Sequence, residues 1–127
     1  MNNYISLGTM SGTSMDGIDL SIINSDGENN TSIVDNFFFE YSSDFKLELI
    51  NIRKEVLQKN DLISKKPIIN DLSRKITLLH VEAINKILKK NPLTKLDLIG
   101  YHGHTLIHKP EQAFTFQLGN PELMAQL

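Results

Sequence analysis

The chain has 127 residues, 40% of them hydrophobic and 22% charged, which fits one soluble domain large enough to bury a core. Its net charge of −2 argues against binding nucleic acid through phosphate neutralisation, which requires a basic excess. The absence of cysteine excludes disulfides, thiolate catalysis and cysteine zinc sites. No apolar run approaches the ~20 residues of a membrane span, and no secretory signal pattern opens the chain. We therefore expect a cytoplasmic protein that contacts neither nucleic acid nor membrane.

The first predicted elements are two strands, residues 4–7 and 18–23, whose apolar and small polar residues alternate. Between them lies a loop rich in Gly, Ser, Thr and Asp. Gly12 and Gly17 can adopt positive φ and let a ligand approach the backbone. Hydroxyl donors are supplied by Thr9, Ser11, Thr13 and Ser14. A concave set of such donors suits a phosphate.

Two acids in the same stretch refine this prediction. Asp16 and Asp19 would repel a bare anion, so we expect the phosphate to bind together with a divalent cation, as in a magnesium nucleotide. The loop lacks a Gly-Lys-Ser/Thr ending and is followed by a strand, so it is not a P-loop. Strand, turn, strand is instead typical of actin, hexokinase and Hsp70 nucleotide folds. A polar hairpin without a ligand is the alternative, since Ser, Gly and Asp are ordinary turn residues.

A third strand and two helices are predicted next. Segment 32–41 is too apolar for an exposed edge, so we expect a strand covered on one face or both, with its three Phe residues in the core. Ser42 or Ser43 offers an N-cap for an amphipathic helix over 44–58. The charges of its polar face are assigned to solvent: Lys46, Glu48, Lys54 and Glu55. A longer helix follows from Ile69 to near Asn91, and its His80 is interpreted as a packing residue.

The last third predicts further sheet. Segment 96–101 is a short apolar strand that we expect to run parallel to the first and to end at His102-Gly103-His104. Segments 105–107 and 114–118 predict a hairpin, and Asn120 with Pro121 predicts a helix start. If extended, His102 and His104 would lie on one side of the chain and could join His108 in a metal site. That metal site is the less favoured interpretation of these histidines.

Two blocks of this sequence resemble the anhydro-N-acetylmuramic acid kinases. Residues 8–19 resemble their amino-terminal signature, whose core is Met-Ser-Gly-Thr-Ser-Leu-Asp-Gly-x-Asp; only Met15 replaces Leu. Residues 99–105 and 116–121 resemble the Ile-Gly-Ser-His-Gly-Gln-Thr and Gln-Ile-Gly-Asn-Pro segments, in the same order. His104 departs from the pattern because it stands where the family usually has Gln.

The resemblance implies an α/β fold, namely part of a ribonuclease H-like lobe of the actin, hexokinase and Hsp70 type, with a mixed sheet and flanking helices. Residues 1–127 would form the amino-terminal part of one lobe, about a third of a typical member, with the second lobe absent. The family's Asp-Phe-Arg, Asn-Ile-Gly-Gly and Asp-Thr-Gly-Pro-Gly-Asn segments do not occur here. We therefore expect the general base beyond Leu127, and doubt that the chain is active alone.

The activity implied is transfer of phosphate from ATP, with Mg²⁺, to the 6-oxygen of 1,6-anhydro-N-acetylmuramic acid while water opens the anhydro ring. The product, N-acetylmuramic acid 6-phosphate, belongs to peptidoglycan recycling. By the match, the ATP phosphates would be held by Gly12, Thr13, Ser14, Met15, Asp16, Gly17, Ile18 and Asp19. Asp16 and Asp19 would lie near the metal. His102 and Gly103 would shape the sugar and phosphate cleft.

Two other functions compete with this one. The first is a non-catalytic half-lobe that binds phosphate or pairs with a partner chain, including a second copy, through exposed apolar surface. The second is a ribonuclease H-like nuclease, which requires several carboxylates around two metals. Strand 4–7 contains no acid, so the nuclease ranks last.

Overall fold

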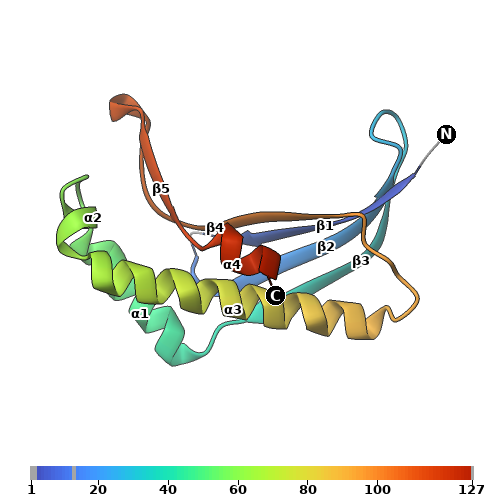
Figure 1. Cartoon of the computed structure of the whole chain (residues 1–127), viewed down its shortest axis with the longest axis horizontal. Coiled ribbons are helices and arrows are strands. Elements are labelled where there is room, and N and C mark those ends of the chain that lie inside the picture. The colour runs from blue at the N-terminus through green and yellow to red at the C-terminus, as the bar shows by residue number, and fades with distance from the viewer. Residues whose placement is uncertain (1–2, 13, 127) are drawn as a thin grey trace.

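The computed structural model describes residues 3–12 and 14–126 and shows a sheet with helices along one face (Figure 1). The strands are β1 (Tyr4–Ser11), β2 (Gly17–Ser25), β3 (Thr31–Glu40), β4 (Leu98–Lys109) and β5 (Phe114–Leu118). The helices are α1 (Ser43–Glu55), α2 (Asp61–Ser64), α3 (Lys66–Lys90) and α4 (Pro121–Gln126), with a 3₁₀ turn, η1 (Pro110–Gln112). None of the helices in this described part is long and apolar enough to cross a membrane.

The five strands form one mixed sheet in the order β3-β2-β1-β4-β5. The first three strands are an antiparallel meander, β4 lies parallel to β1, and β5 returns antiparallel to β4. The parallel pairing follows from the crossover through α1, α2 and α3, since parallel neighbours need a long connection. The predicted α/β class, with a mixed sheet and flanking helices, is confirmed.

The hydrophobic core lies between the sheet and the helices. Alternate residues of the central strands point toward α1 and α3, because successive side chains in a strand face opposite sides. The fully buried side chains that form the centre are Leu7, Ile18, Ile22, Leu49, Ile52, Leu72, Ile76, Ile87 and Leu118. Each large aliphatic side chain buried in this way contributes roughly 1.5–3 kcal/mol of transfer free energy.

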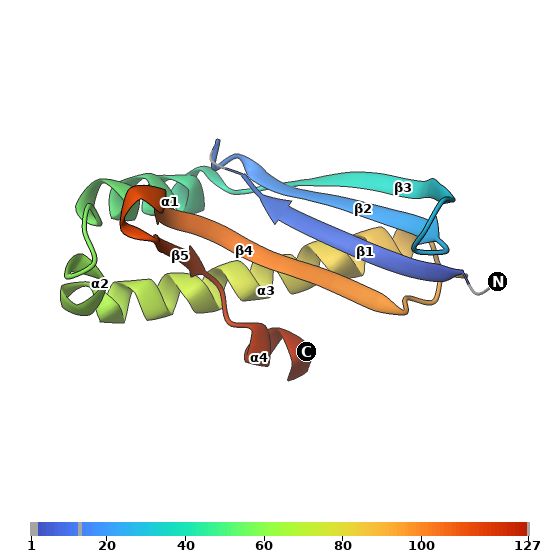
Figure 2. The ribbon, with the colours of Figure 1, turned by 90° about the horizontal axis from the view of Figure 1, so that it is seen from above.

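The opposite face of the sheet is bare. Figure 2 looks onto this face and shows the strands in front, with α1 and α3 behind them. We define the bare face by its exposed apolar side chains, which are Tyr4, Met10, Ile33, Phe38 and Leu98. Asp19 of β2 pairs with Met10 on β1 and with Phe38 on β3, so two of these apolar side chains lie on either side of its carboxylate.

The prediction that segment 32–41 avoids a sheet edge is wrong, because β3 is the edge strand beside β2. Its three Phe residues also divide between environments. Phe39 is buried against the helices, Phe37 is half-buried, and Phe38 is 49% exposed on the bare face. The period of two places neighbouring residues on opposite sides, so a run of three Phe cannot enter one core.

Both predicted helices are confirmed, with small shifts in their ends. Ser42 is the N-cap of α1, and its hydroxyl accepts a hydrogen bond from the Phe45 N–H at 3.2 Å. Helix α3 begins at Lys66, near Pro67, and ends at Lys90. Helix α2 was not predicted, since its four residues are too few to show a helical period.

The prediction that the fourth strand ends at residue 101 is wrong. Strand β4 continues through His102 to Lys109 and includes the segment expected to be a separate strand. The β1–β4 register advances from Thr9–Tyr101 to Ser11–His104, so β4 has one extra residue there. Gly103 has a φ of +75° at this bulge. A glycine in left-handed conformation lets the strand bend without ending.

Candidate functional site at the β1–β2 loop

The candidate site is the loop of residues 12–16, which follows the carboxyl end of β1. Because β1 and β4 are parallel neighbours, this loop lies at the edge of the sheet where α/β proteins bind ligands. Of the predicted site residues, Thr13 lies outside the described residues. Gly12 and Ser14–Asp16 form the described part of the loop, while Gly17, Ile18 and Asp19 belong to β2.

The loop backbone turns at a residue other than the expected glycines. Met15 has a φ of 59°, and its N–H donates to the Gly12 carbonyl at 3.1 Å. Gly12 and Gly17 both lie outside the left-handed region, so the expectation that they supply positive φ is wrong. A Cβ on Gly17 would lie 2.1 Å from the Phe39 carbonyl oxygen, whereas one on Gly12 would meet open space. Gly17 therefore serves strand packing, and Gly12 leaves the loop accessible.

A cation stands beside the loop. Lys46, on the first turns of α1, donates from Nζ to Oδ1 of Asp16 in a partly exposed ion pair. The hydrogen bond and charge of Lys46 hold the pKa of Asp16 below its usual range, with a smaller contribution from Ser14. The assignment of Lys46 to solvent is corrected: its ammonium group is within reach of the loop. Sequence reasoning missed it because nothing in a charged helix face indicates a contact 30 residues away.

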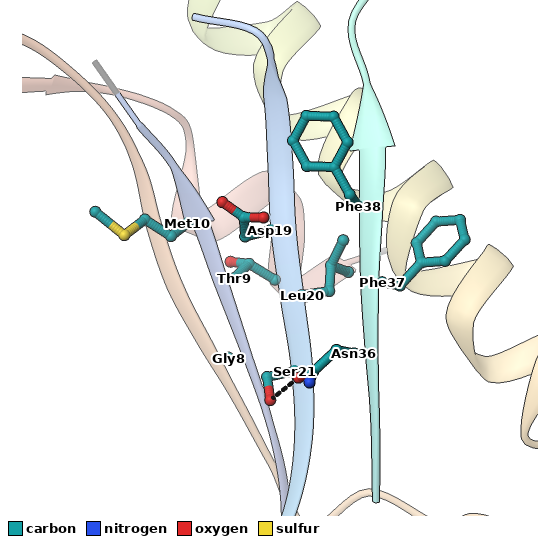
Figure 3. Close-up of a pocket in the computed structure, with 9 residues that line it drawn as sticks. All are labelled: Gly8, Thr9, Met10, Asp19, Leu20, Ser21, Asn36, Phe37 and Phe38. Atoms are coloured by element: carbon teal, nitrogen blue, oxygen red, sulfur yellow. Dashed lines mark hydrogen bonds between the residues drawn. The ribbon is translucent and has the colours of Figure 1, made fainter. Parts of the chain in front are cut away.

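The two acids of the motif lie on opposite faces of the sheet. Asp19 pairs in register with Met10 and Phe38, and it lines a hollow of about 550 Å³ on the bare face (Figure 3). Its carboxylate has no hydrogen-bond or ion-pair partner among the described residues. Asp16 instead contacts α1 on the helix side. Within the described residues, no three His, Cys, Asp or Glu side chains converge on a metal position. The structure thus does not bring Asp16 and Asp19 together. Ile18 is buried in the core, so only its backbone faces the loop.

The bulge in β4 separates the histidines. His102 is exposed and its Nε2 lies 2.8 Å from Nε2 of Gln117 on β5. His104 is buried, so the expectation that both rings share one side of an extended strand is wrong. The extra residue reverses the alternation of side chains. Gly103 is confined by β5, since a Cβ would lie 2.1 Å from the Leu118 carbonyl oxygen.

A buried polar network adjoins the loop. The Tyr41 hydroxyl donates to Ser11 Oγ at 2.7 Å, and Ser11 Oγ lies 2.8 Å from His104 Nδ1. Burial raises the pKa of Tyr41 and lowers the pKa of His104, because both charged forms lose solvation. The sequence contains no signal for this network, since its members come from three distant segments. The network includes Ser11, the last residue before the loop, so we treat the network as part of the site.

The described residues fit a phosphate better than a divalent cation. Gly12 is open to approach, and Ser14 and Lys46 offer a hydroxyl and a positive charge. A cation bound to Asp16 would compete with the ammonium group of Lys46 for the same oxygen. The loop therefore supplies charge neutralisation and hydrogen bonds for an anion, while a metal would need further ligands.

Known proteins of one family match nearly the whole chain. The family model described as anhydro-N-acetylmuramic acid kinase matches residues 3–127. The anhydro-N-acetylmuramic acid kinase of Pelagibacter ubique is 42% identical over 124 residues, covering 98% of this chain and 33% of that relative. Those of Brucella canis and Agrobacterium fabrum are 34% and 30% identical, each covering 94% of this chain and 33% of the relative.

The matched region is therefore nearly the whole of this chain but only a third of each relative. Identity at this level over 122–125 residues, together with the family model, leaves one assignment. The chain belongs to the anhydro-N-acetylmuramic acid kinase family and corresponds to its amino-terminal portion.

Proposed function

We propose that residues 1–127 are the amino-terminal part of one ribonuclease H-like kinase lobe and that the loop at 12–16 binds the phosphates of ATP. Two observations support the fold assignment: the sheet order β3-β2-β1-β4-β5 and the crossover from the meander to a parallel β4. The second lobe would come from polypeptide corresponding to the rest of the relatives. The proposal places the protein in the cytoplasm, where ATP is available.

The reaction we propose for the complete protein is phosphorylation of the 6-oxygen of 1,6-anhydro-N-acetylmuramic acid with hydrolytic opening of the anhydro ring, in peptidoglycan recycling. In this reaction ATP would supply the phosphoryl group. Mg²⁺, when bound, would neutralise part of the phosphate charge. Phosphoryl transfer depends mainly on positioning and charge stabilisation, which a loop with an adjacent cation provides. The observation that carries the proposal is the placement of Lys46 beside the family's signature loop.

The residues of the loop and of β4 would contribute to binding in different ways. Gly12 and Ser14 would contact phosphate through backbone and hydroxyl donors, and Lys46 would contribute positive charge. Asp16 would hold Lys46 in the absence of nucleotide and would lie near the metal in its presence. His102 and Gly103 would border the sugar cleft from β4. We assign no general base to this chain and expect it beyond Leu127. Asp19 faces away from the loop and takes no part in phosphate binding here.

The binding half of the proposal is tested by titrating the chain with magnesium ATP and following backbone amide signals by NMR. We expect signals of residues 12–17 to shift, and Lys46→Ala to weaken binding at least about 10-fold, as loss of a charge-assisted contact implies. Lys54→Ala is the matched control, since Lys54 lies on the exposed side of the same helix. Absence of loop shifts at millimolar nucleotide, or equal loss in both variants, would contradict phosphate binding at this loop.

The catalytic half is tested by mass spectrometry of mixtures of the chain, ATP, Mg²⁺ and 1,6-anhydro-N-acetylmuramic acid. We expect no N-acetylmuramic acid 6-phosphate from this chain alone, because we place the base in the region that only the longer relatives contain. Product formation that disappears in Asp16→Asn but persists in Asp44→Asn would show that these 127 residues suffice. That result would overturn our assignment of the base to a region outside these 127 residues.

A second function is favoured by the bare face. Five apolar side chains are exposed there, and Asp19 lies among them without a partner in the described residues. Exposed apolar patches of this kind mark protein interaction surfaces. The chain would then act by pairing with a partner, including a second copy, through the sheet.

Pairing is tested by analytical ultracentrifugation across a range of concentrations. We expect self-association that the double variant Met10→Ser, Phe38→Ser weakens at least about 10-fold, because burial of apolar area drives it. Ile63→Ser with Leu93→Ser is the control, since both are more exposed but lie outside the bare face. A chain that is monomeric at every concentration excludes pairing between copies.

A further inference from the structure

Tyr41 contacts both ends of the β1–β2 loop. Its backbone N–H donates to the Asp16 carbonyl at 2.9 Å, where the loop ends. Its side-chain hydroxyl donates to Ser11 Oγ at 2.7 Å, at the last residue before the loop. One buried residue thus spans the base of the loop, 5% exposed and packed edge-on against the Phe45 ring at 4.9 Å.

His104 extends this connection into β4. Its Nδ1 lies 2.8 Å from Ser11 Oγ, and Ser11 and His104 are each only 3% exposed. Ser11 accepts from Tyr41, so its own proton is available to donate to His104. That direction requires Nδ1 to be unprotonated, with the ring neutral and its proton on Nε2. The chain of donors then runs from Tyr41 through Ser11 to His104.

The surroundings of His104 favour the neutral ring. Burial lowers its pKa, and the charges of Arg53 on α1 and His102 on β4 act in the same direction, while a hydrogen bond to the Ser11 backbone opposes them. His80 on α3 faces it as a further ionisable ring, itself buried. Tyr41 and Tyr101 are the other titratable groups nearby, and burial keeps both uncharged at neutral pH. No carboxylate is among the groups that shift the pKa of His104.

We propose that Tyr41 is a positioning residue that clamps the two ends of the β1–β2 loop, and that neutral His104 orients Ser11 for this clamp. The inference rests on the proposed function, in which the loop binds phosphate. Holding the loop ends in place before binding reduces the ordering cost when a ligand arrives. Tyr41 also packs on Phe45, the neighbour of Lys46, so the clamp positions the loop and its cation together.

The clamp is tested without any ligand, by amide hydrogen exchange of the complete chain measured by NMR. Tyr41→Phe removes the hydroxyl and keeps the ring. We expect exchange of the residue 41 amide and of loop amides 14–16 to accelerate by roughly 3- to 10-fold, the effect of one lost buried hydrogen bond. Tyr101→Phe is the matched control, because it removes another tyrosine hydroxyl, which is partly buried and bonded to Thr77 at 2.9 Å rather than to Ser11. The control should leave loop exchange unchanged.

Ser11→Ala breaks the same hydrogen bond from the other side, so it tests the clamp if Tyr41→Phe fails to fold. Loop exchange that stays at the wild-type rate in either folded variant overturns the clamp. Magnesium ATP titration of the same samples separates the two proposals. Faster loop exchange in a chain whose loop never responds to nucleotide would keep the clamp and remove the phosphate-binding role.

The part played by His104 is tested by pH. Protonating Nδ1 removes the acceptor for Ser11, so we expect the loop amide signals of the wild type to move as the pH falls below 6.5. His104→Gln supplies an acceptor that does not titrate and should abolish that movement while retaining the slow loop exchange. His108 is an exposed histidine farther along β4, so His108→Gln is the control. This variant should retain the movement of the loop amide signals with pH. Loop signals that titrate equally in His104→Gln would contradict the role of His104.

Discussion

At the scale of single residues, the close approach of strands decides where glycine is required. Gly17 leaves the Phe39 carbonyl oxygen only 2.1 Å from the position of an added Cβ, whereas an added Cβ on Gly8 meets nothing within 4 Å. Both residues lie in strands of the meander, Gly8 within β1 and Gly17 at the start of β2. The difference between them is therefore one of packing against β3 rather than of backbone conformation.

Gly17→Ala should lower the free energy of unfolding by about 1–3 kcal/mol, because the new methyl group forces β2 and β3 apart. Gly8→Ala should change it by less than about 1 kcal/mol, since the side chain enters open space on the bare face. Urea unfolding of both variants measures the difference. Equal losses at the two positions would mean that β2 and β3 approach less closely than described.

His80 is a second residue whose setting has a measurable consequence. It is fully buried in α3, its Nδ1 donates to the Ile76 carbonyl at 2.7 Å, and its Nε2 has no hydrogen-bond partner among the described residues. Its ring packs edge-on against Tyr101 at 4.8 Å. Burial therefore lowers the pKa of His80 to about 4. The interpretation of His80 as a packing residue is confirmed.

Because the folded pKa of His80 lies below its unfolded value near 6.5, the folded state favours the neutral ring. The contribution of His80 to the free energy of unfolding is fully present above pH 6.5. It is lost as the pH decreases toward 4, which lowers the free energy of unfolding by on the order of 3 kcal/mol. His80→Leu should flatten that decline, while His108→Leu, at an exposed position, should not. Urea unfolding at pH 7, 5 and 4 tests this. A full decline in His80→Leu would assign the acid sensitivity to other groups, of which His104 shifts in the same direction.

At the scale of elements, the start of α1 depends on one of two adjacent serines. The sequence permits either Ser42 or Ser43 as N-cap. In the structure Ser42 has extended backbone dihedrals and accepts from the Phe45 N–H, while Ser43 is already helical. Because Phe45 and Lys46 follow in the first turns, this cap also positions the cation beside the loop.

Ser42→Ala should cost about 1 kcal/mol, the usual effect of losing an N-cap, and Ser43→Ala should be nearly neutral. Chemical denaturation of the two variants measures these costs under identical conditions. If Ser43→Ala were the more damaging change, the helix would begin one residue later than described.

The bulge in β4 is the element that sequence patterns could least predict. Apolar alternation up to Tyr101 indicates a strand, and the polar triplet His102-Gly103-His104 then resembles a loop. The bulge lies where the β1–β4 register shifts by one residue, between Tyr101 and His104, and where the pairing of β4 with β5 begins at His104. His104 pairs with Leu118, 14 residues away, and with Ser11, 93 residues away. These distant partners set the geometry, and no local pattern encodes it.

At the scale of the whole molecule, burial is concentrated in the centre of the sheet and α3. Helices α2 and α4 contain no buried residue, and the β4–β5 hairpin rises away from the sheet (Figure 1). Local opening follows the density of buried contacts, so stability should not be uniform along the chain. We expect the central strands and α3 to be the most resistant to opening.

Native-state hydrogen exchange should therefore show the slowest amides in β1, β2 and the middle of α3, with rates close to those of global unfolding. Amides of α2, α4 and the tip around η1 should exchange at least about 100-fold faster, since their opening exposes little apolar surface. Low concentrations of urea should accelerate only the slow group. Protection in α4 equal to that of β1 would indicate a more uniform molecule.

The amino-acid sequence by itself determined the types of the longer helices and strands, the N-cap region of α1, the family and the position of the signature loop, because periodicity, caps and contiguous motifs are local properties. Only the tertiary structure decided the neighbours of that loop. It placed Lys46 beside Asp16, turned Asp19 to the bare face, divided Phe37 from Phe38 and joined Tyr41 to both loop ends. These contacts arise when strands and helices distant in sequence pack together, and side-chain direction in a strand depends on a register that only pairing defines.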